Sequence, residues 1–246
     1  MLRERGENDM KKAISPFLAL CLGLLIPGFV TGTAQAASSH EDLQDRIDAA
    51  KTVVDQIVNT PDNTIPLGIL KQATCVAVIP SVKKGAFIVG AEYGQGVVTC
   101  RTGHGWSGPV FIRLAGGSFG FQIGGQATDL VLVAVNDHGF QDLLKSKFKI
   151  GGDAAASAGP VGRNSQASTD IGMSAELLTY SRSKGLFAGI DLNGVTVSQN
   201  TEDTDVFYGQ SYGFRTVLHG DVAVPQGAES FVRTVAHAFV DAKMNH

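Results

Sequence analysis

Apolar residues recur at helical spacing near the start of the chain and again at its end. Between residues 39 and 59 they follow steps of three and four, which predicts one stripe of an amphipathic helix; the stripe consists of Leu43, Ile47, Ala50, Val54 and Ile57. Ser39, in front of an acidic first turn, is typical of a capped helix start. A second short helix is expected to end at Gln72, and a closing helix follows Pro225.

From residue 74 onward the pattern changes to short β-rich runs divided by glycines. These runs read TCVAVIP, GAFIVGAEY, GVVTCR, GPVFIRLAG, SFGFQIGGQ and DLVLVAVN, and later DIGMSAELLTYSR, GLFAGIDL and GVTVSQN. HGFQDLLKSK predicts a helix among them, and DVFYGQSYGFRTVLHG predicts a loop followed by a short helix. Regularly spaced short strands indicate a largely antiparallel sheet or barrel, and interior glycines indicate bulges or tight curvature. We therefore predict an α+β fold whose curved, glycine-rich, mostly antiparallel sheet or partial barrel is flanked by N- and C-terminal helices.

One short pattern occurs twice, as SVKKGAF at residues 81–87 and as SRSKGLF at residues 181–187. Ser-x-x-Lys is also the nucleophile signature of penicillin-binding proteins and class A β-lactamases, where it lies on a helix. Here Pro80 precedes the first copy and Gly85 interrupts it, and the companion motifs of those enzymes are absent. We interpret both copies as hairpin turns whose serines bond to nearby backbone.

The first 36 residues have the parts of a secretory signal peptide. Met10 and two lysines precede an apolar run over residues 13–30, and an Ala-x-Ala sequence follows it. This order predicts cleavage between Ala36 and Ala37, with Met10 as a candidate for the true start. An uncleaved membrane anchor would need about 20 apolar residues, whereas two prolines interrupt this run, and Cys21 lacks the preceding small residue of a lipoprotein. We expect a single domain over residues 37–246 of an exported protein, in the periplasm or associated with the cell envelope.

Two cysteines remain in the expected mature chain, Cys75 and Cys100. An even number of cysteines in an exported protein favours a disulfide, and two buried thiols are the alternative. The chain as a whole carries a formal net charge of −3. Because no overall basic excess exists, we do not expect binding to nucleic acid through net charge.

The sequence predicts no catalytic residue, no metal site and no cofactor. The six histidines show none of the spacings of metal-binding motifs. The glycine-rich stretch at residues 151–163 lacks the Lys-Ser or Lys-Thr pair of a phosphate-binding loop. We therefore expect a protein that is not an enzyme.

A local basic patch is the more specific feature. Lys145, Lys147 and Lys149 alternate, so they share one face if residues 145–150 are extended. Further basic residues mark the two copies of the repeated pattern: Lys83, Lys84, Arg182 and Lys184. Each basic side chain near an anionic membrane contributes about 1 kcal/mol of attraction. Solvated lysines on an ordinary soluble surface are the alternative interpretation.

Ordered stretches along the chain resemble the SYLF domain: SVKKGAFIVGAEYGQGVV, GWSGPVFIRLAGGSFGFQIGGQATDLVLV, GPVGR and YSRSKGLFAGIDLNG. The resemblance runs from about residue 43 to the C-terminus. Eukaryotic SYLF proteins bind phosphoinositides, fungal members are actin-associated endocytic proteins, and bacterial members are commonly exported. The resemblance implies lipid binding without known catalysis, and Arg163 of GPVGR joins the candidate lipid-binding residues.

The combined prediction is an exported, non-enzymatic phospholipid-binding protein that contacts anionic membrane lipids through its local basic surface. A structural or protein-interaction module of the cell envelope is the alternative. We do not expect actin as a partner, because an exported chain would not meet it. The N-terminal helix is expected to pack against the domain, since its acidic residues oppose insertion into a membrane. Five phenylalanines are candidates to line an apolar groove formed by the curved sheet: Phe87, Phe111, Phe119, Phe121 and Phe187.

Overall fold

The computed structural model describes residues 38–59, 65–86, 89–119, 126–162, 175–183 and 186–244. All of them belong to one compact unit that spans Ala37–His246. The predicted signal peptide, with its cleavage site at Ala36 and Ala37 and the candidate start at Met10, lies outside these residues and remains a prediction.

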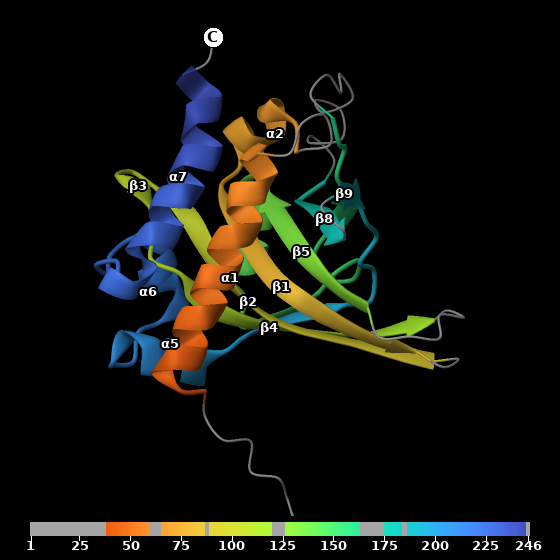
Figure 1. Cartoon of the computed structure of the whole chain (residues 1–246), viewed down its shortest axis with the longest axis horizontal. Coiled ribbons are helices and arrows are strands. Elements are labelled where there is room, and N and C mark those ends of the chain that lie inside the picture. Colours follow the sequence, from red (N-terminus) through yellow and green to blue (C-terminus); the bar gives the residue numbers. More distant parts are fainter. Residues whose placement is uncertain are drawn as a thin grey trace, which may run out of the picture. The chain divides into compact units, whose positions relative to one another are not determined.

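Helices stand at both ends of the described chain, and strands dominate its middle. The elements in chain order are α1 (His40–Asn59), α2 (Leu67–Gln72), β1 (Cys75–Ala86), β2 (Val89–Thr102), β3 (Gly105–Trp106), β4 (Val110–Phe119), β5 (Gln126–Ala134), α3 (Asp137–Leu143), β6 (Lys147–Lys149), β7 (Ala156–Ala158), β8 (Leu177–Ser183), β9 (Leu186–Gly189), β10 (Thr196–Gln199), α5 (Thr201–Tyr208), α6 (Phe214–His219), the 3₁₀ turn η1 (Gln226–Ala228) and α7 (Glu229–Met244). Figure 1 shows this arrangement.

The described strands form one ten-stranded sheet, with the order β6-β10-β4-β2-β1-β5-β8-β7 and with β3 and β9 as side branches. Every pairing is antiparallel except that of β7 with β8. The sheet curls into an open half-barrel, which confirms the predicted fold class. The turn at residues 150–155 joins the two edge strands, β6 and β7. At its end, the carbonyl of Ala155 accepts hydrogen bonds from the amides of Glu176 and of Leu177, the first residue of β8.

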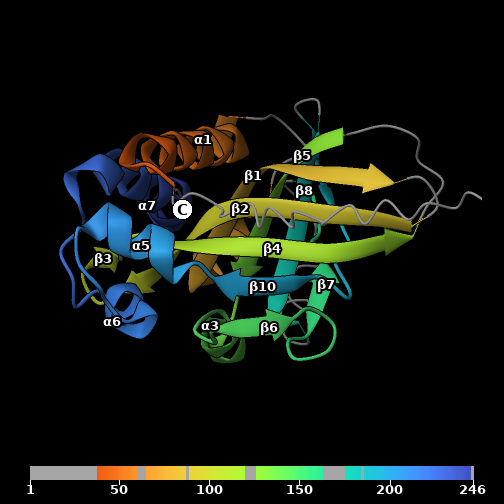
Figure 2. The same ribbon diagram turned by 90° about the horizontal axis from the view of Figure 1, so that it is seen from below.

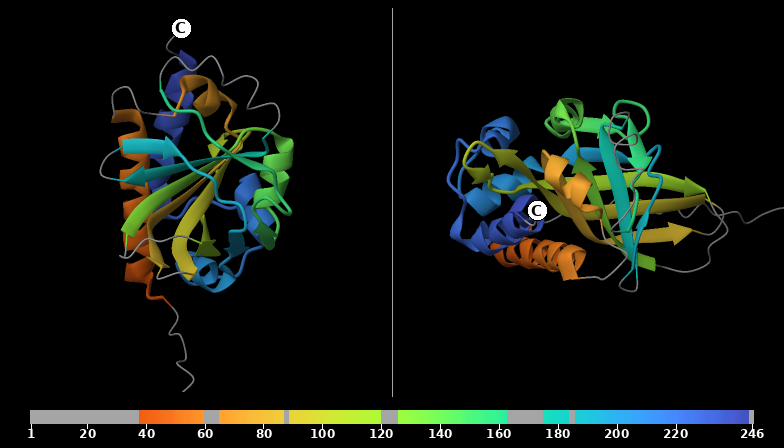
Figure 3. Two further views of the ribbon diagram at one scale, coloured as in Figure 1. Left: turned by 90° about the vertical axis from the view of Figure 1, so that its right-hand side faces the viewer. Right: turned by 90° about the horizontal axis from the view of Figure 1, so that it is seen from above.

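Each face of the sheet packs against its own set of helices. In both views of Figure 3, α1 and α7 lie on one side of the sheet and α3 lies on the opposite side. We call the apolar cluster on the first side, which includes Val76, Val78 and Phe231, the outer core. The cluster on the second side, which includes Ile79, Leu132 and the α6 residue Leu218, is the inner core. Residues 75–79 of β1 and 130–134 of β5 are therefore buried on both faces, as their continuous apolar sequences require.

The predicted N-terminal helix is confirmed as α1. Its five stripe residues are fully buried in the outer core, where α1 packs against α7 and the sheet. At its start, the Asp42 amide donates to the Ser39 hydroxyl over 3.1 Å, and the Ser39 amide donates back to the Asp42 carboxylate over 2.9 Å. This reciprocal cap satisfies amides that the first turn leaves unbonded.

Two sequence interpretations differ from the structure. The predicted loop before α6 starts within the helix α5, whose second half it covers. Asn200 caps this helix by accepting a hydrogen bond from the amide of Asp203, and the left-handed residue Gly209 follows its last residue, Tyr208. The first repeated pattern is not a hairpin turn, because residues 81–86 continue strand β1. The second copy does lie at a hairpin, since β8 ends at Ser183 and pairs back with β9 from Leu186.

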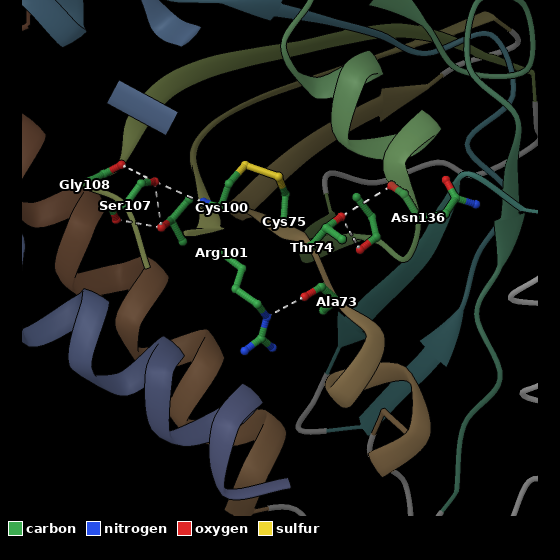
Figure 4. The surroundings of a disulfide bond; sticks show 10 residues. Ala73, Thr74, Cys75, Cys100, Arg101, Ser107, Gly108 and Asn136 are labelled. Carbon is green, nitrogen blue, oxygen red and sulfur yellow. Dashed lines mark hydrogen bonds between the residues drawn. A yellow bond between two sulfur atoms is a disulfide. The ribbon is translucent and has the colours of Figure 1, made fainter. Parts of the chain in front are cut away.

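The predicted disulfide between Cys75 and Cys100 is present. These residues are direct cross-strand partners on β1 and β2, and both are fully buried in the inner core. Figure 4 shows the hydrogen bonds around the bridge: the Cys100 amide donates to the Ser107 hydroxyl, and the side chain of the adjacent Arg101 donates to the carbonyl of Ala73. The bridge therefore fastens the start of β1 to the end of β2, close to the C-terminus of α2.

Reduction of this disulfide should lower the free energy of unfolding by about 3.5 kcal/mol, because the bridge closes a chain segment with a separation of 25 residues. Urea unfolding of the wild-type protein with and without reductant measures the loss. The Cys75→Ala/Cys100→Ala variant is the control, and its stability should not respond to reductant. An equal response of both proteins would contradict a stabilising role for the bridge.

Candidate functional site

Strand β1 contains a β-bulge that changes which of its side chains face outward. Its pairing with β2 is regular up to Val78 and resumes at Lys83, and its pairing with β5 shifts between Ile79 and Val82. Within the bulge, Ser81 has φ of 51° and is the non-glycine residue with positive φ in the described part of the chain. An extra residue in one strand reverses the alternation beyond it, so Val82 enters the inner core while Lys83 is exposed.

Beyond this bulge, outward-facing side chains of five neighbouring strands align in one row across the outer side of the sheet. The register pairs Lys83 with Tyr93, Tyr93 with Ala115, Ala115 with Thr196, and Thr196 with Lys149. Directly opposite residues in antiparallel strands point to the same face. Figure 2 shows these strands side by side, with the helices gathered at one end of them.

A second row runs beside the first, from Lys147 through Ser198 and Arg113 to Gln95. We call the two rows together the basic face; it consists of Lys83, Tyr93, Gln95, Arg113, Ala115, Lys147, Lys149, Thr196 and Ser198. Four of these side chains are cationic and none is acidic. Adjacent strands lie about 4.8 Å apart, so the four steps from β6 to β1 span about 19 Å along the sheet.

The structure thus brings together three of the predicted lipid-binding residues. Lys147 and Lys149 flank the buried Phe148 on β6, and both are exposed, as the predicted alternation requires. Lys83 lies in the same row as Lys149, four strands away from it. Sequence reasoning missed Arg113 and Tyr93, which join these lysines only through the strand register. The alternation of apolar and polar residues within β4 and β2 indicated that Arg113 and Tyr93 face outward. It did not indicate which lysines lie beside them on the neighbouring strands.

Two further predicted residues are engaged in ion pairs. The Lys145 ammonium lies 2.5 Å from the carboxylate of Asp142, and this hydrogen bond raises the pKa of Lys145. Lys145 precedes β6 and so is not part of its alternation. Arg182 forms a bond of 3.1 Å to Asp129 on the neighbouring strand β5, and its side chain is only 17% exposed. Both cations are therefore partly neutralised.

The remaining predicted residues are not placed. Arg163 and Lys184 lie outside the described residues, and only the backbone of Lys84 is described, opposite Glu92. A role of any of the eight residues in lipid binding remains a prediction. Phe111 and Phe187 belong to the outer core, so they do not line a groove inside the curl. Phe87, Phe121 and the side chain of Phe119 are not described.

A groove of about 350 Å³ lies between α1 and the edge of the basic face formed by Lys83, Tyr93 and Gln95. Its walls are formed by α1, by the bulge of β1 and by the part of β2 opposite that bulge. The lining residues are Asp42, Asp45, Arg46, Ala49, Pro80, Ser81, Lys83, Tyr93, Gly94 and Gln95. The groove carries charges of both signs, and its two aspartates lie on the helix side. It marks the boundary at which the outer side of the sheet passes from beneath the helix to solvent.

Arg46 fixes α1 at this boundary. Its guanidinium donates to Asp203 of α5 over 2.6 Å and to Gln95 of β2 over 2.7 Å. It also lies 5.5 Å from the centre of the Phe111 ring. The side chains of Arg46 and Asp203 are 12% and 2% exposed, respectively, so three elements meet at one nearly buried ion pair.

No group of three or more histidine, cysteine, aspartate or glutamate side chains in the described ranges could hold a metal ion. None of the described helices is both long enough and apolar enough to cross a membrane.

A family model described as "Ysc84: Las17-binding protein actin regulator" matches residues 115–238 of the chain. The chain belongs to this family. The resemblance to SYLF domains is therefore confirmed. The matched segment of the Ysc84-family chain begins within β4 and ends within α7, so it contains Lys147 and Lys149 of the basic face.

Relatives with assigned names extend the similarity toward the N-terminus. SH3 domain-containing YSC84-like protein 1 of Rattus norvegicus is 37% identical over 173 residues, which cover 70% of this chain and 51% of the relative. Protein YSC84 of Saccharomyces cerevisiae is 33% identical over 190 residues, covering 75% and 40%. LAS seventeen-binding protein 3 of the same species is 34% identical over 182 residues, covering 71% and 39%. The Ysc84-family chain thus spans about half or less of the length of these relatives.

These comparisons correct two expectations. The expectation that actin is not a partner is wrong, because the family is described as an actin regulator and a relative is named for binding Las17. The expectation of an exported protein in the periplasm or envelope is also wrong, because the matching relatives belong to rat and yeast and the family is described by actin regulation. Both expectations rested on the predicted signal peptide, which itself lies outside the described residues.

Replacement of Asp203 by alanine should lower the free energy of unfolding by about 3 kcal/mol, because it leaves the nearly buried Arg46 without its charged partner. Chemical denaturation followed by circular dichroism measures this loss. Glu229→Ala is the matched control, since it removes a carboxylate from the exposed pair with Arg233 and should cost less than about 1 kcal/mol. Similar losses in both variants would show that the Arg46 pair does not hold α1 in place.

Proposed function

We propose that this chain is a non-enzymatic protein-interaction domain that serves actin regulation and contacts an acidic partner through the basic face. The family description and the name of the Las17-binding relative support the actin context. The observation that carries the choice of surface is the alignment of Lys83, Lys147 and Lys149 with Arg113 across five hydrogen-bonded strands. Among the described outward positions of these strands, from β6 to β1, none is acidic.

The physical basis of the proposal is electrostatic complementarity. A surface with one sign of charge accelerates association with an oppositely charged partner and opposes like-charged ones. The cations of the basic face stand on paired strands, so their spacing is set by the sheet rather than by a mobile loop. Because the three lysines are exposed and Arg113 is partly exposed, each ion pair with a partner would contribute little alone. The expected interaction is therefore of modest affinity and weakens as salt is added.

The triple variant Lys83→Gln/Lys147→Gln/Lys149→Gln should bind actin filaments about tenfold more weakly than the wild-type chain, because three exposed ion pairs together contribute between about 1 and 3 kcal/mol. Co-sedimentation with filamentous actin at low salt measures the affinity. The control Lys51→Gln/Lys71→Gln/Arg233→Gln removes the same charge from α1, α2 and α7, and it should bind as the wild type does. Equal losses in both triple variants, or no binding by the wild type, would contradict the proposal.

Binding to an anionic phospholipid surface is the second candidate function, and Tyr93 is the observation that favours it. This side chain is 43% exposed and lies opposite Lys83 in the same row. Tyrosine is enriched where an apolar membrane meets water, because its ring is apolar and its hydroxyl is polar. A lysine near an anionic surface adds about 1 kcal/mol of attraction. Tyr93 and the lysines together could therefore dock the basic face on such a surface.

If this second function holds, the wild-type chain should float with phosphatidylcholine vesicles that contain phosphatidylserine and not with vesicles of phosphatidylcholine alone. The same three lysine replacements should weaken binding by about 100-fold, as three contributions of about 1 kcal/mol imply. Tyr93→Ala should weaken vesicle binding without altering the salt dependence. Equal flotation with both vesicle types, or flotation unaffected by the lysine replacements, would eliminate the lipid function of this face.

A further inference from the structure

We propose that Asp129 is a positioning residue for the basic face: by holding the β-bulge at Ser81, it determines that Lys83 points outward. The consequence for binding rests on the proposed function, whereas the effect on strand register does not. Asp129 lies on β5, beside β1, and is itself not aligned in either row of the basic face. It would act through the backbone of Ser81 rather than by touching the partner.

The alternation of β1 shows why the bulge matters. Val78 belongs to the outer core and Ile79 to the inner core. Without an extra residue, position 83 would share the face of Ile79, because the two are four residues apart and side chains alternate with a period of two. With the bulge, Val82 takes the inner position and Lys83 becomes the outward partner of Tyr93. A single inserted residue therefore decides whether this lysine faces the inner core or solvent.

The contacts of Asp129 hold this irregularity in place. One carboxylate oxygen accepts a hydrogen bond of 2.9 Å from the amide of Ser81. The other oxygen accepts a hydrogen bond of 3.1 Å from Nε of Arg182, and Nη2 of the same guanidinium lies 3.1 Å from this oxygen in an ion pair. Side chains of Asp129 and Arg182 are 16% and 17% exposed, so the pair is largely shielded from water. The carboxylate of Asp129 thus links Ser81 in the first repeated pattern to Arg182 in the second.

The left-handed conformation of Ser81 gives this contact its importance. Residues with a side chain rarely adopt positive φ, and they keep it only where surrounding interactions fix it. The opposite strand also leaves room for the bulge at Gly94, where a Cβ would lie 2.6 Å from Ile79 and 2.7 Å from Val82. In the described part of the chain, the carboxylate of Asp129 is the side chain that bonds the Ser81 amide.

Positioning and simple charge predict opposite effects of removing Asp129. Loss of an acidic group near a cationic face should strengthen its binding to an acidic partner. Loss of the group that holds the bulge should weaken binding, because Lys83 no longer keeps its place in the row. The sign of the change therefore separates the two explanations.

The first experiment compares Asp129→Ala with Asp221→Ala, which removes the same charge from an exposed position after α6. We expect Asp129→Ala to bind filamentous actin about fivefold more weakly, as the loss of one exposed ion pair implies. We expect Asp221→Ala to bind as tightly as the wild type or more tightly. Tighter binding by Asp129→Ala would overturn the proposal.

The second experiment reports on register without any partner. Backbone NMR of the wild-type chain should show cross-strand contacts of Lys83 with both Tyr93 and Ala127. Ser81→Gly should keep these contacts, because glycine adopts positive φ readily, whereas Ser81→Val and Asp129→Ala should lose them. Circular dichroism establishes whether each variant is folded. If Asp129→Ala does not fold, the comparison of Ser81→Gly with Ser81→Val tests whether the bulge sets the register of Lys83. Retention of the contacts in Asp129→Ala or Ser81→Val overturns the proposal, while absence of actin binding by the wild type refutes only the proposed function.

Discussion

Strand β1 imposes the constraint on which the rest of this structure depends, because it has to bury both faces at one end and expose one face at the other. Where α1 covers the sheet, Val76 and Val78 pack outward while Cys75, Ala77 and Ile79 pack inward. Further along, the helices end and the outer side meets solvent. A strand with strict two-residue alternation would turn Lys83 toward the inner core. The bulge at Ser81 resolves this conflict by reversing the alternation at the point where the helical cover ends.

The boundary between covered and exposed sheet is maintained by polar contacts rather than by apolar packing alone. Arg46 joins α1 to β2 and α5, and its partner Asp203 is almost completely buried. A buried ion pair contributes little net stability against a well-packed apolar alternative, but breaking one is costly. Its effect here is to fix where α1 lies on the sheet. The disulfide between Cys75 and Cys100 acts at the other end of the covered region, so β2 is secured on both sides of that region.

Much of the fold could be predicted from the sequence, because its signals are local. The stripe of α1, the Ser39 cap and the alternating runs each depend on near neighbours. The helix α5 was missed since its sequence is polar, although Asn200 and Gly209 are ordinary signals of a helix start and end. The first repeated pattern was misread as a turn because its Lys-Gly pair resembles one. No local signal reveals that the amide of Ser81 is bonded by a carboxylate 48 residues away.

The candidate site could be predicted only in part, for a related reason. The alternation of Lys147 and Lys149 is visible in the sequence, whereas their alignment with Arg113 and Lys83 is a property of strand register. Lys145 was grouped with them by spacing, but its ion pair with Asp142 and its place before β6 separate it. The errors about export and actin arose differently, from one N-terminal segment whose composition was taken to decide the partner of the whole domain.

The repeated pattern itself shows how register converts similar sequences into different structures. In the first copy the serine occupies a bulge within a long strand, and in the second Ser181 pairs regularly with Leu130 while the strand soon turns back. Both copies nevertheless border β5, and both antiparallel pairings give them the same direction. Their basic ends therefore lie at the same end of the sheet, with Asp129 between them. Because the cations stand on paired strands, the curvature set by the inner core also sets their separation, and any partner has to match a spacing that the packing of the sheet determines.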